Sequence, residues 1–161
     1  NLSWMDFYDE ALINEIVDFL EHSEFPSELI RFEITETSYA ALEENVGKVL
    51  NKIKEKGAWI LLDDFGSGYS SLSTLNRMHF DTIKLDKSLV DYIGDDNGEK
   101  LLNSITKLAQ SFGMEITAEG VETVEQLMFL CNLDCDDIQG YYFSRPLPVR
   151  EYEECLKEAC M

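Results

Sequence analysis

Five short apolar runs in the chain each end in acidic or amide residues. The runs end at Glu33-Ile34-Thr35-Glu36, Asp63-Asp64-Phe65-Gly66, Lys84-Leu85-Asp86, Glu119-Gly120-Val121-Glu122 and Gln139-Gly140. A helix-like stretch follows each run. Parallel α/β folds have this order of elements, and they gather their functional groups at the carboxyl ends of the strands. The sequence therefore predicts an α/β fold with acidic side chains along one edge of its sheet.

The hydrophobic pattern also places the individual elements. It predicts helices at 6–22, 39–56, 71–78, 101–112, 123–130 and 149–160, and strands at 30–36, 58–62, 80–85, 114–118 and 136–138. The strands start about 20 to 34 residues apart, which is the size of a βα unit. A closed eight-stranded barrel typically takes about 250 residues, and this chain has 161. The fold is therefore expected to be an open sheet or the later portion of a barrel.

The charge balance limits the classes of partner. Acidic residues outnumber basic ones by 32 to 13, for a formal net charge of -19. Such a surface repels nucleic acids and anionic membranes, so neither is expected as a partner. No apolar run reaches the roughly 20 residues of a membrane-spanning helix, and no signal-peptide pattern opens the chain. A small anionic substrate would need local cations, which a bound divalent metal would supply.

The cysteines and histidines do not form a recognisable metal site. The spacings of Cys131, Cys135, Cys155 and Cys160 lack the paired two-residue gaps of a zinc site. Free thiols in a reducing compartment are expected instead. His22 and His79 lie in polar or strand-edge surroundings, so no catalytic role is expected for either.

The acidic strand ends favour a site for a hard cation. Asp63 and Asp64 follow a buried strand, where Asp is also common as a helix or turn cap. Lys84 and Asp86 lie two residues apart, so on a strand they face the same way. Lys84 then serves as a counter-ion or holds a nucleophilic water, and the sequence leaves both roles open. Carboxylates gathered in this way repel one another without cations, which favours bound metal.

A loop rich in glycine and serine follows Asp64. Its sequence, Gly66-Ser67-Gly68-Tyr69-Ser70-Ser71, is compatible with a phosphate cradle or with a gate over the site. A loop of this kind does not by itself distinguish the two.

Taken together and in order, these motifs resemble the EAL-domain family of cyclic di-GMP phosphodiesterases. They are Phe32-Glu33-Ile34-Thr35-Glu36, Asp63-Asp64-Phe65-Gly66-Ser67-Gly68-Tyr69-Ser70-Ser71-Leu72, Ile83-Lys84-Leu85-Asp86, Ala118-Glu119-Gly120-Val121-Glu122-Thr123 and Gln139-Gly140-Tyr141-Tyr142-Phe143-Ser144-Arg145-Pro146. Asn1-Leu2-Ser3 also matches the family's Asn-x-Ser strand end. The resemblance covers essentially the whole chain. It implies a TIM-type (β/α) barrel with one reversed strand, and hydrolysis of cyclic di-GMP to linear pGpG.

The resemblance also implies roles for individual residues. Two Mg²⁺ or Mn²⁺ ions are expected on Asn1, Glu33, Asp63, Asp64 and Glu119. Lys84 is expected to orient the attacking water, and Glu119 has the further role of a candidate general base. The residues expected to support the site are Glu36, Asp86, Glu122 and Gln139, and the gating loop comprises Phe65, Gly66, Ser67, Gly68, Tyr69 and Ser70.

The upstream Glu-x-Leu motif of the family is absent from the chain. Residues 1–161 are therefore expected to be the C-terminal portion of an EAL domain, truncated before its first strands and helices and inactive or nearly so alone. The alternative is a degenerate EAL domain that binds cyclic di-GMP as a receptor. A third reading is a dimerisation module, since a homodimer through residues 64–75 is expected. An upstream GGDEF or sensory domain and a cytoplasmic location complete the expectations.

Overall fold

The protein is described by a computed structural model that covers residues 1–3, 5–35, 44–67 and 80–159. Within these residues, five strands form one parallel sheet in the order β1-β2-β3-β4-β5. The strands are β1 (Arg31–Thr35), β2 (Trp59–Phe65), β3 (Thr82–Leu85), β4 (Glu115–Ala118) and β5 (Asp137–Ile138). Residues 1–3 pair with β1 through one parallel bridge, between Leu2 and Ile34. The predicted α/β class is confirmed.

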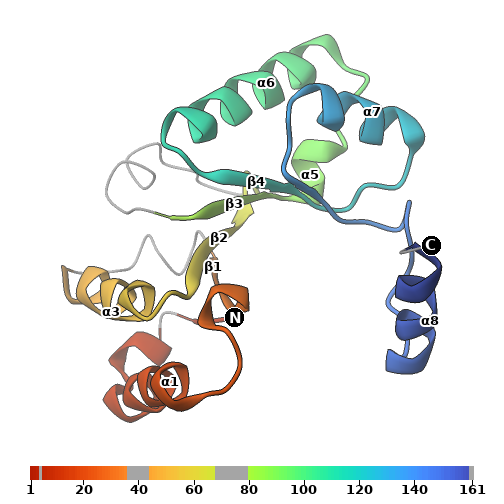
Figure 1. Cartoon of the computed structure of the whole chain (residues 1–161). Helices are drawn as coiled ribbons and strands as arrows, with labels where there is room; N and C mark the ends of the chain where they lie inside the picture. Colours follow the sequence, from red (N-terminus) through yellow and green to blue (C-terminus); the bar gives the residue numbers. More distant parts are fainter. Residues whose placement is uncertain (4, 36–43, 68–79, 160–161) are drawn as a thin grey trace.

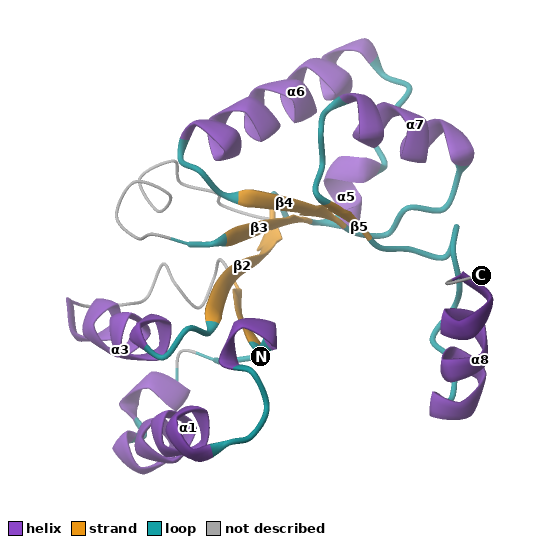
Figure 2. Cartoon of the chain, viewed as in Figure 1, coloured by secondary structure: helices purple, strands orange, loops and turns teal. Residues whose placement is uncertain are grey.

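The helices alternate with the strands along the chain (Figure 2). They are the 3₁₀ turns η1 (Asp6–Tyr8) and η2 (Ser27–Leu29), and the α-helices α1 (Glu10–His22), α3 (Glu44–Glu55), α5 (Lys87–Val90), α6 (Asp96–Ser111), α7 (Val124–Asn132) and α8 (Val149–Ala159). In Figure 1, α1 and α3 lie on the side of β1 and β2, and α6 and α7 lie beyond β3 and β4. The C-terminal α8 stands apart from this layer.

The two faces of the sheet differ in chemistry because side chains alternate along each strand. One face carries a row of fully buried aliphatic side chains, which pair across neighbouring strands: Ile34 with Leu62, Leu62 with Ile83, and Ile83 with Ile116. These residues belong to the main apolar core, together with Leu50 and Ile53 of α3 and Leu102 of α6. The opposite face carries the charged side chains of the candidate site.

The polar face of the sheet is concave. Arg31 on β1 reaches Asp137 on β5, the strand at the far edge of the sheet, with 3.2 Å between Nη1 and Oδ2. The same guanidinium lies 3.8 Å from Glu115 of β4 and stacks over the Trp59 ring. A contact between edge strands requires a strongly curled sheet. The described strands form an open curved sheet, so the closed barrel stays a prediction.

Several predicted boundaries were wrong, and for two helices a capping side chain sets the start. The first α-helix begins at Glu10 rather than residue 6, where Asp9 accepts hydrogen bonds from the Ala11 and Leu12 N–H groups. Likewise α6 begins at Asp96 rather than 101, with Asp95 as its cap. The strand predicted at 58–62 continues to Phe65. The single turn α5 was not predicted, and the predicted helix at 71–78 lies outside the described residues.

The thiols are free, as expected, at the three cysteines that the structure describes: Cys131, Cys135 and Cys155. Burial, with a smaller contribution from the neighbouring Asp136, raises the pKa of Cys135 to about 12, so this thiol stays protonated near neutral pH. Cys160 lies outside the described residues. Among the described helices, none combines the length and the apolar character needed to cross a membrane.

Adjacent leucines on α6 provide a test of the core. Leu102 is fully buried, whereas Leu101 is 46% exposed. We expect Leu102→Ala to lower the free energy of unfolding by about 2 to 5 kcal/mol, because it leaves a cavity in the core. Leu101→Ala should cost less than about 1 kcal/mol. Urea unfolding of both variants measures the difference, and equal losses would contradict the assigned helix face.

Candidate active site

Lys84 of β3 lies at the centre of three carboxylates that come from three neighbouring segments. Its Nζ atom is 2.7 Å from Glu33 Oε1 at β1, 2.9 Å from Asp63 Oδ1 at β2 and 2.8 Å from Glu119 Oε1 just after β4. The lysine side chain is only 8% exposed. Parallel pairing explains the convergence, because it brings the carboxyl ends of β1 to β4 to the same edge of the sheet.

The charges in this cluster do not balance. One ammonium group faces three carboxylates, so negative charge is in excess. Burial by itself lowers the pKa of Lys84, but the contacts with Glu119, Glu33 and Asp63 outweigh it and raise that pKa above its ordinary value. Lys84 is therefore a permanent cation near neutral pH, and the remaining negative field attracts further cations.

A β-bulge brings a second aspartate to the same place. Between Leu62 and Phe65 the register of β2 against β3 shifts by one residue. As a result, Asp63 and Asp64 together oppose Lys84, and Phe65 returns to the buried apolar face. Asp64 adopts the left-handed backbone conformation, with φ of 56°, which Asp tolerates better than most residues. The bulge and the left-handed backbone of Asp64 give a structural reason to expect both carboxylates on the side of the site.

Asp64 shares the electrostatic field of the cluster. Burial raises its pKa first, and the carboxylates of Asp63, Asp86 and Glu33 raise it further, while Lys84 partly offsets them. Asp64 therefore lies within electrostatic reach of Glu33 and Asp63, two of the acids that surround Lys84. The folded protein thus holds several carboxylates that would gain from a bound cation.

The donor chemistry fits a hard divalent cation. Asp63 Oδ1 is buried and accepts no well-oriented hydrogen bond from a described residue, although Lys84 Nζ lies within ion-pair distance. Carboxylate oxygens are the ligands that Mg²⁺ and Mn²⁺ prefer. Within residues 1–3, 5–35, 44–67 and 80–159, however, no group of three His, Cys, Asp or Glu side chains is arranged as a metal-ligand cluster. Here the acid oxygens converge on the ammonium of Lys84.

The other predicted site residues lie around this centre in different settings. Asn1 is exposed and lies beside Glu33, because the Leu2 N–H donates to the Glu33 carbonyl at 2.8 Å. Gln139 is exposed after β5, and its N–H donates to the Ala118 carbonyl at 2.8 Å. Of the gating loop, Phe65 is buried and Ser67 exposed, with Gly66 between them. The loop residues Gly68, Tyr69 and Ser70 and the predicted supporting residue Glu36 lie outside the described residues.

Asp86 does not share a strand face with Lys84, so that prediction was wrong. The strand β3 ends at Leu85, and Asp86 is the N-cap of α5. Its carboxylate accepts a hydrogen bond from the Ser88 N–H at 2.9 Å. Hydrogen bonds from Ser88 hold the pKa of Asp86 below its ordinary value, despite partial burial. Asp86 therefore fixes the turn after β3.

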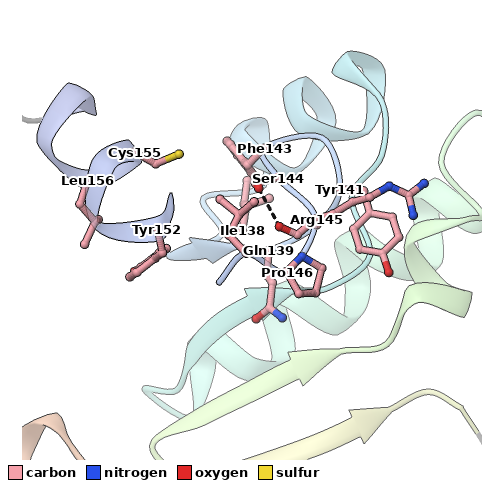
Figure 3. Close-up of a pocket in the computed structure, with 12 residues that line it drawn as sticks. Ile138, Gln139, Tyr141, Phe143, Ser144, Arg145, Pro146, Tyr152, Cys155 and Leu156 are labelled. Carbon is pink, nitrogen blue, oxygen red and sulfur yellow. Dashed lines mark hydrogen bonds between the residues drawn. The ribbon is translucent and has the colours of Figure 1, made fainter. Parts of the chain in front are cut away.

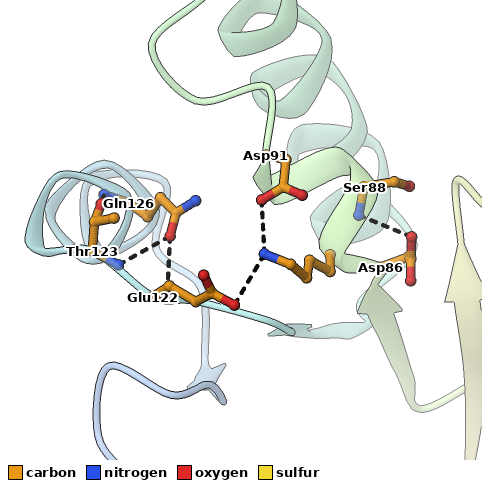
Figure 4. A network of polar contacts seen from close by, with 7 residues as sticks. Asp86, Ser88, Asp91, Glu122, Thr123 and Gln126 are labelled. Atoms are coloured by element: carbon orange, nitrogen blue, oxygen red, sulfur yellow. Dashed lines mark hydrogen bonds and ion pairs between the residues drawn. The ribbon is translucent and has the colours of Figure 1, made fainter.

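Lys87 was missed by sequence reasoning, although it directly follows the Lys84-Leu85-Asp86 motif. Its ammonium lies 3.0 Å from Asp91 Oδ1 and 3.3 Å from Glu122 Oε1. The ammonium thus bridges the carboxylates of Asp91 and Glu122, which face each other in Figure 4. Glu122 follows Lys87 by 35 positions in the chain, so no local sequence pattern could have indicated this contact.

A cavity lies beyond Gln139, between the loop after β5 and α8. Its volume is about 690 Å³, and most of its lining side chains are aromatic or aliphatic. Figure 3 shows Gln139 and Pro146 on one side of it and Tyr152, Cys155 and Leu156 of α8 on the other. The guanidinium of Arg145 stacks over the Tyr141 ring at 4.6 Å.

A protein-family model described as the EAL domain matches residues 1–146. Among curated proteins, the chain is 35% identical over 148 residues to the "Cyclic di-GMP phosphodiesterase NbdA" of Pseudomonas aeruginosa, covering 91% of this chain and 19% of that protein. It is 37% identical over 152 residues to the "Oxygen sensor protein DosP" of Escherichia coli, covering 94% of this chain and 19% of that protein. The chain thus spans about a fifth of these relatives' length.

Solved structures show the same fold. The structure described as "PaMucR Phosphodiesterase, c-di-GMP complex" has a TM-score of 0.84 and 29% identity, with 94% of this chain and 62% of that chain covered. A Klebsiella pneumoniae protein, "BlrP1 pH 9.0 manganese/cy-diGMP complex", has a TM-score of 0.82 and 32% identity, with 91% of this chain and 38% of that chain covered.

Removal of the central cation should destabilise the chain in metal-free buffer. We expect Lys84→Met to lower the free energy of unfolding by about 3 kcal/mol, because it leaves carboxylates facing one another without a partner. Urea unfolding with a chelator present measures the loss, and Lys107→Met, at an exposed position of α6, is the control. Unchanged stability of Lys84→Met would contradict the central role of this ion-pair cluster.

The raised pKa of Asp64 predicts a pH dependence of stability. An acid whose pKa is higher in the folded state than in the unfolded state destabilises the fold as pH rises through that pKa. Asp64→Asn should therefore be more stable than the natural chain near neutral pH without metal, and should gain nothing below the ordinary aspartate pKa of about 4. Asn also tolerates the left-handed backbone. Urea unfolding across this pH range tests the prediction, and a gain that is independent of pH would contradict it.

Proposed function

The chain belongs to the EAL domain family, and we propose that it forms the metal-binding and catalytic part of a cyclic di-GMP phosphodiesterase. The observation that carries the proposal is the cluster of Lys84 with carboxylates from three strand ends. Three further findings support it: the name of the relative NbdA, the cyclic di-GMP in the PaMucR complex and the manganese in the BlrP1 complex. The reaction would add water across one phosphodiester bond of cyclic di-GMP and give linear pGpG.

The acidic residues would hold the metal. We assign two Mg²⁺ or Mn²⁺ ions to Asn1, Glu33, Asp63, Asp64 and Glu119. When bound, such ions lower the pKa of water and stabilise negative charge on the attacking and leaving oxygens. Their positive charge would also offset the acid excess that otherwise repels an anionic substrate.

Lys84 and Glu119 would perform the remaining chemistry. Because its pKa is raised, Lys84 keeps its protons, so it orients a water by donating hydrogen bonds and does not act as a base. Glu119 lies 2.8 Å from Lys84 Nζ with its side chain 22% exposed, which leaves its carboxylate accessible to accept a proton from that water. The Glu119 N–H donates to the Leu85 carbonyl, which ties this residue to β3.

Binding without hydrolysis is the second candidate function. It is favoured by the arrangement of the acids within the described residues, which converge on Lys84 rather than on a common metal position. In that case the chain belongs to a cyclic di-GMP receptor, and metal would not increase product formation.

The setting of the domain follows from the family. We propose residues 1–161 as the C-terminal portion of an EAL domain, which needs upstream strands for full activity. A GGDEF or sensory domain in the same protein is consistent with the oxygen-sensor name of the relative DosP. A homodimer through residues 64–75 and a cytoplasmic location are further proposals, which rest on the resemblance alone.

The deciding experiment measures conversion of cyclic di-GMP to pGpG in manganese buffer, on this chain and on a form extended upstream. We expect turnover in the extended form and little in the chain alone. Glu119→Gln in the extended form should lower kcat by about 10² to 10⁴-fold, because it removes the candidate general base. Glu125→Gln, at an exposed position of α7, is the matched control. Undiminished turnover of Glu119→Gln would overturn its assigned role, and binding without product in the extended form would favour the receptor.

A further inference from the structure

The single turn α5 lies between the two loops that border the candidate site. It follows directly after β3, the strand that carries Lys84, and Asp86 caps it. Toward β2, a Cβ atom on Gly66 would lie 2.3 Å from Leu89 Cδ1 of α5. Toward β4, a Cβ atom on Gly120 would lie 2.6 Å from Lys87 Cβ and Cγ. Both loops therefore approach α5 as closely as only glycine allows.

Both the aliphatic stem and the ammonium of Lys87 contact the loop after β4. Its aliphatic stem lies against Gly120, which has φ of 70°, a left-handed conformation that disfavours larger residues. Its ammonium continues past the glycine to Glu122 and Asp91, as Figure 4 shows for the two carboxylates. An ion pair at the surface would account for the contact of the ammonium, but not for the packing of the stem against Gly120.

The segment that Lys87 covers is otherwise held by main-chain groups. The Glu119 N–H donates to the Leu85 carbonyl at 3.0 Å, and the Val121 N–H donates to the Gln139 carbonyl at 3.1 Å. The Glu122 N–H donates to Gln126 Oε1 at 2.8 Å. Gly120 lies between the first two of these hydrogen bonds. A side chain packed against this glycine therefore limits how far the Glu119 end of the segment can turn.

We propose that Lys87 is a positioning residue that holds residues 119–122 against β3 and thereby fixes the carboxylate of Glu119 beside Lys84. Lys87 does not touch the reacting atoms in this proposal. The catalytic consequence rests on the proposed function, whereas the structural consequence does not. The ion pairs of Lys87 are 45 to 51% exposed, so their loss should change stability little. A misplaced catalytic group, by contrast, can cost about 10²-fold in rate.

Hydrogen exchange tests the structural part on this chain, without any need for activity. We expect Lys87→Ala to speed exchange of the Glu119 and Val121 amides by about tenfold, because the segment opens more often. Lys87→Met keeps the stem and should have a smaller effect, and Lys87→Arg should restore protection. Lys107→Ala on α6 is the control and should leave both amides unchanged. Unchanged exchange in Lys87→Ala would overturn the proposal.

Kinetics of the upstream-extended form test the catalytic part. We expect Lys87→Ala to lower kcat about tenfold with KM changed less than twofold, and Lys87→Arg to recover most of the loss. Urea unfolding identifies any variant that fails to fold, in which case Lys87→Met replaces it. A fall in kcat without faster exchange would overturn the proposal, since Lys87 would then act in another way. Absence of turnover in the unmodified protein would overturn the proposed function, and exchange alone would then decide the role of Lys87.

Discussion

The arrangement of the sheet and of the candidate site depends on one buried cation. A lysine with its side chain 8% exposed is unfavourable inside a protein unless carboxylates compensate it. Glu33, Asp63 and Glu119 do so from three different segments, at 2.7 to 2.9 Å. A one-residue slip of any neighbouring strand would turn its acid to the apolar face. The ion-pair cluster therefore forms only in this strand register, and it stabilises that register in turn.

The bulge in β2 allows one strand to place apolar side chains in the core and two adjacent carboxylates at the site. Leu62 and Phe65 must both reach the apolar core, although three residue steps separate them and regular alternation would place them on opposite faces. The extra residue restores Phe65 to the core and leaves Asp63 and Asp64 together opposite Lys84. The left-handed Asp64 is a local strain that the packed residues on either side maintain. Core packing thus supports a crowded pair of carboxylates that would otherwise be unfavourable.

The sequence predicted those features that depend on periodicity. Parallel strands that end in acids predicted the meeting of Glu33, Asp63 and Glu119, because strand geometry alone determines which edge they share. The placement of Asp86 on a strand face was wrong, since an aspartate two residues after Lys84 fits both a strand face and a helix cap, and the hydrogen bond with Ser88 decides between them. The packing of Lys87 on Gly120 arises only when segments far apart in the sequence meet, so no local pattern indicated it.

In the proposed function, the negative charge of the cluster gives the metal a second role besides catalysis, which is to reduce the repulsion of an anionic substrate. Lys84 stays protonated near neutral pH, so its charge is constant and cannot regulate the site. Because the carboxylates exceed it in number, and the whole chain carries a net charge of -19, the dianionic substrate of the proposed function would meet a repulsive field. In the proposed function, a divalent cation would offset the excess negative charge of the cluster where the phosphodiester binds. In the proposed function, metal binding and substrate binding would therefore be coupled through electrostatics, and each would strengthen the other.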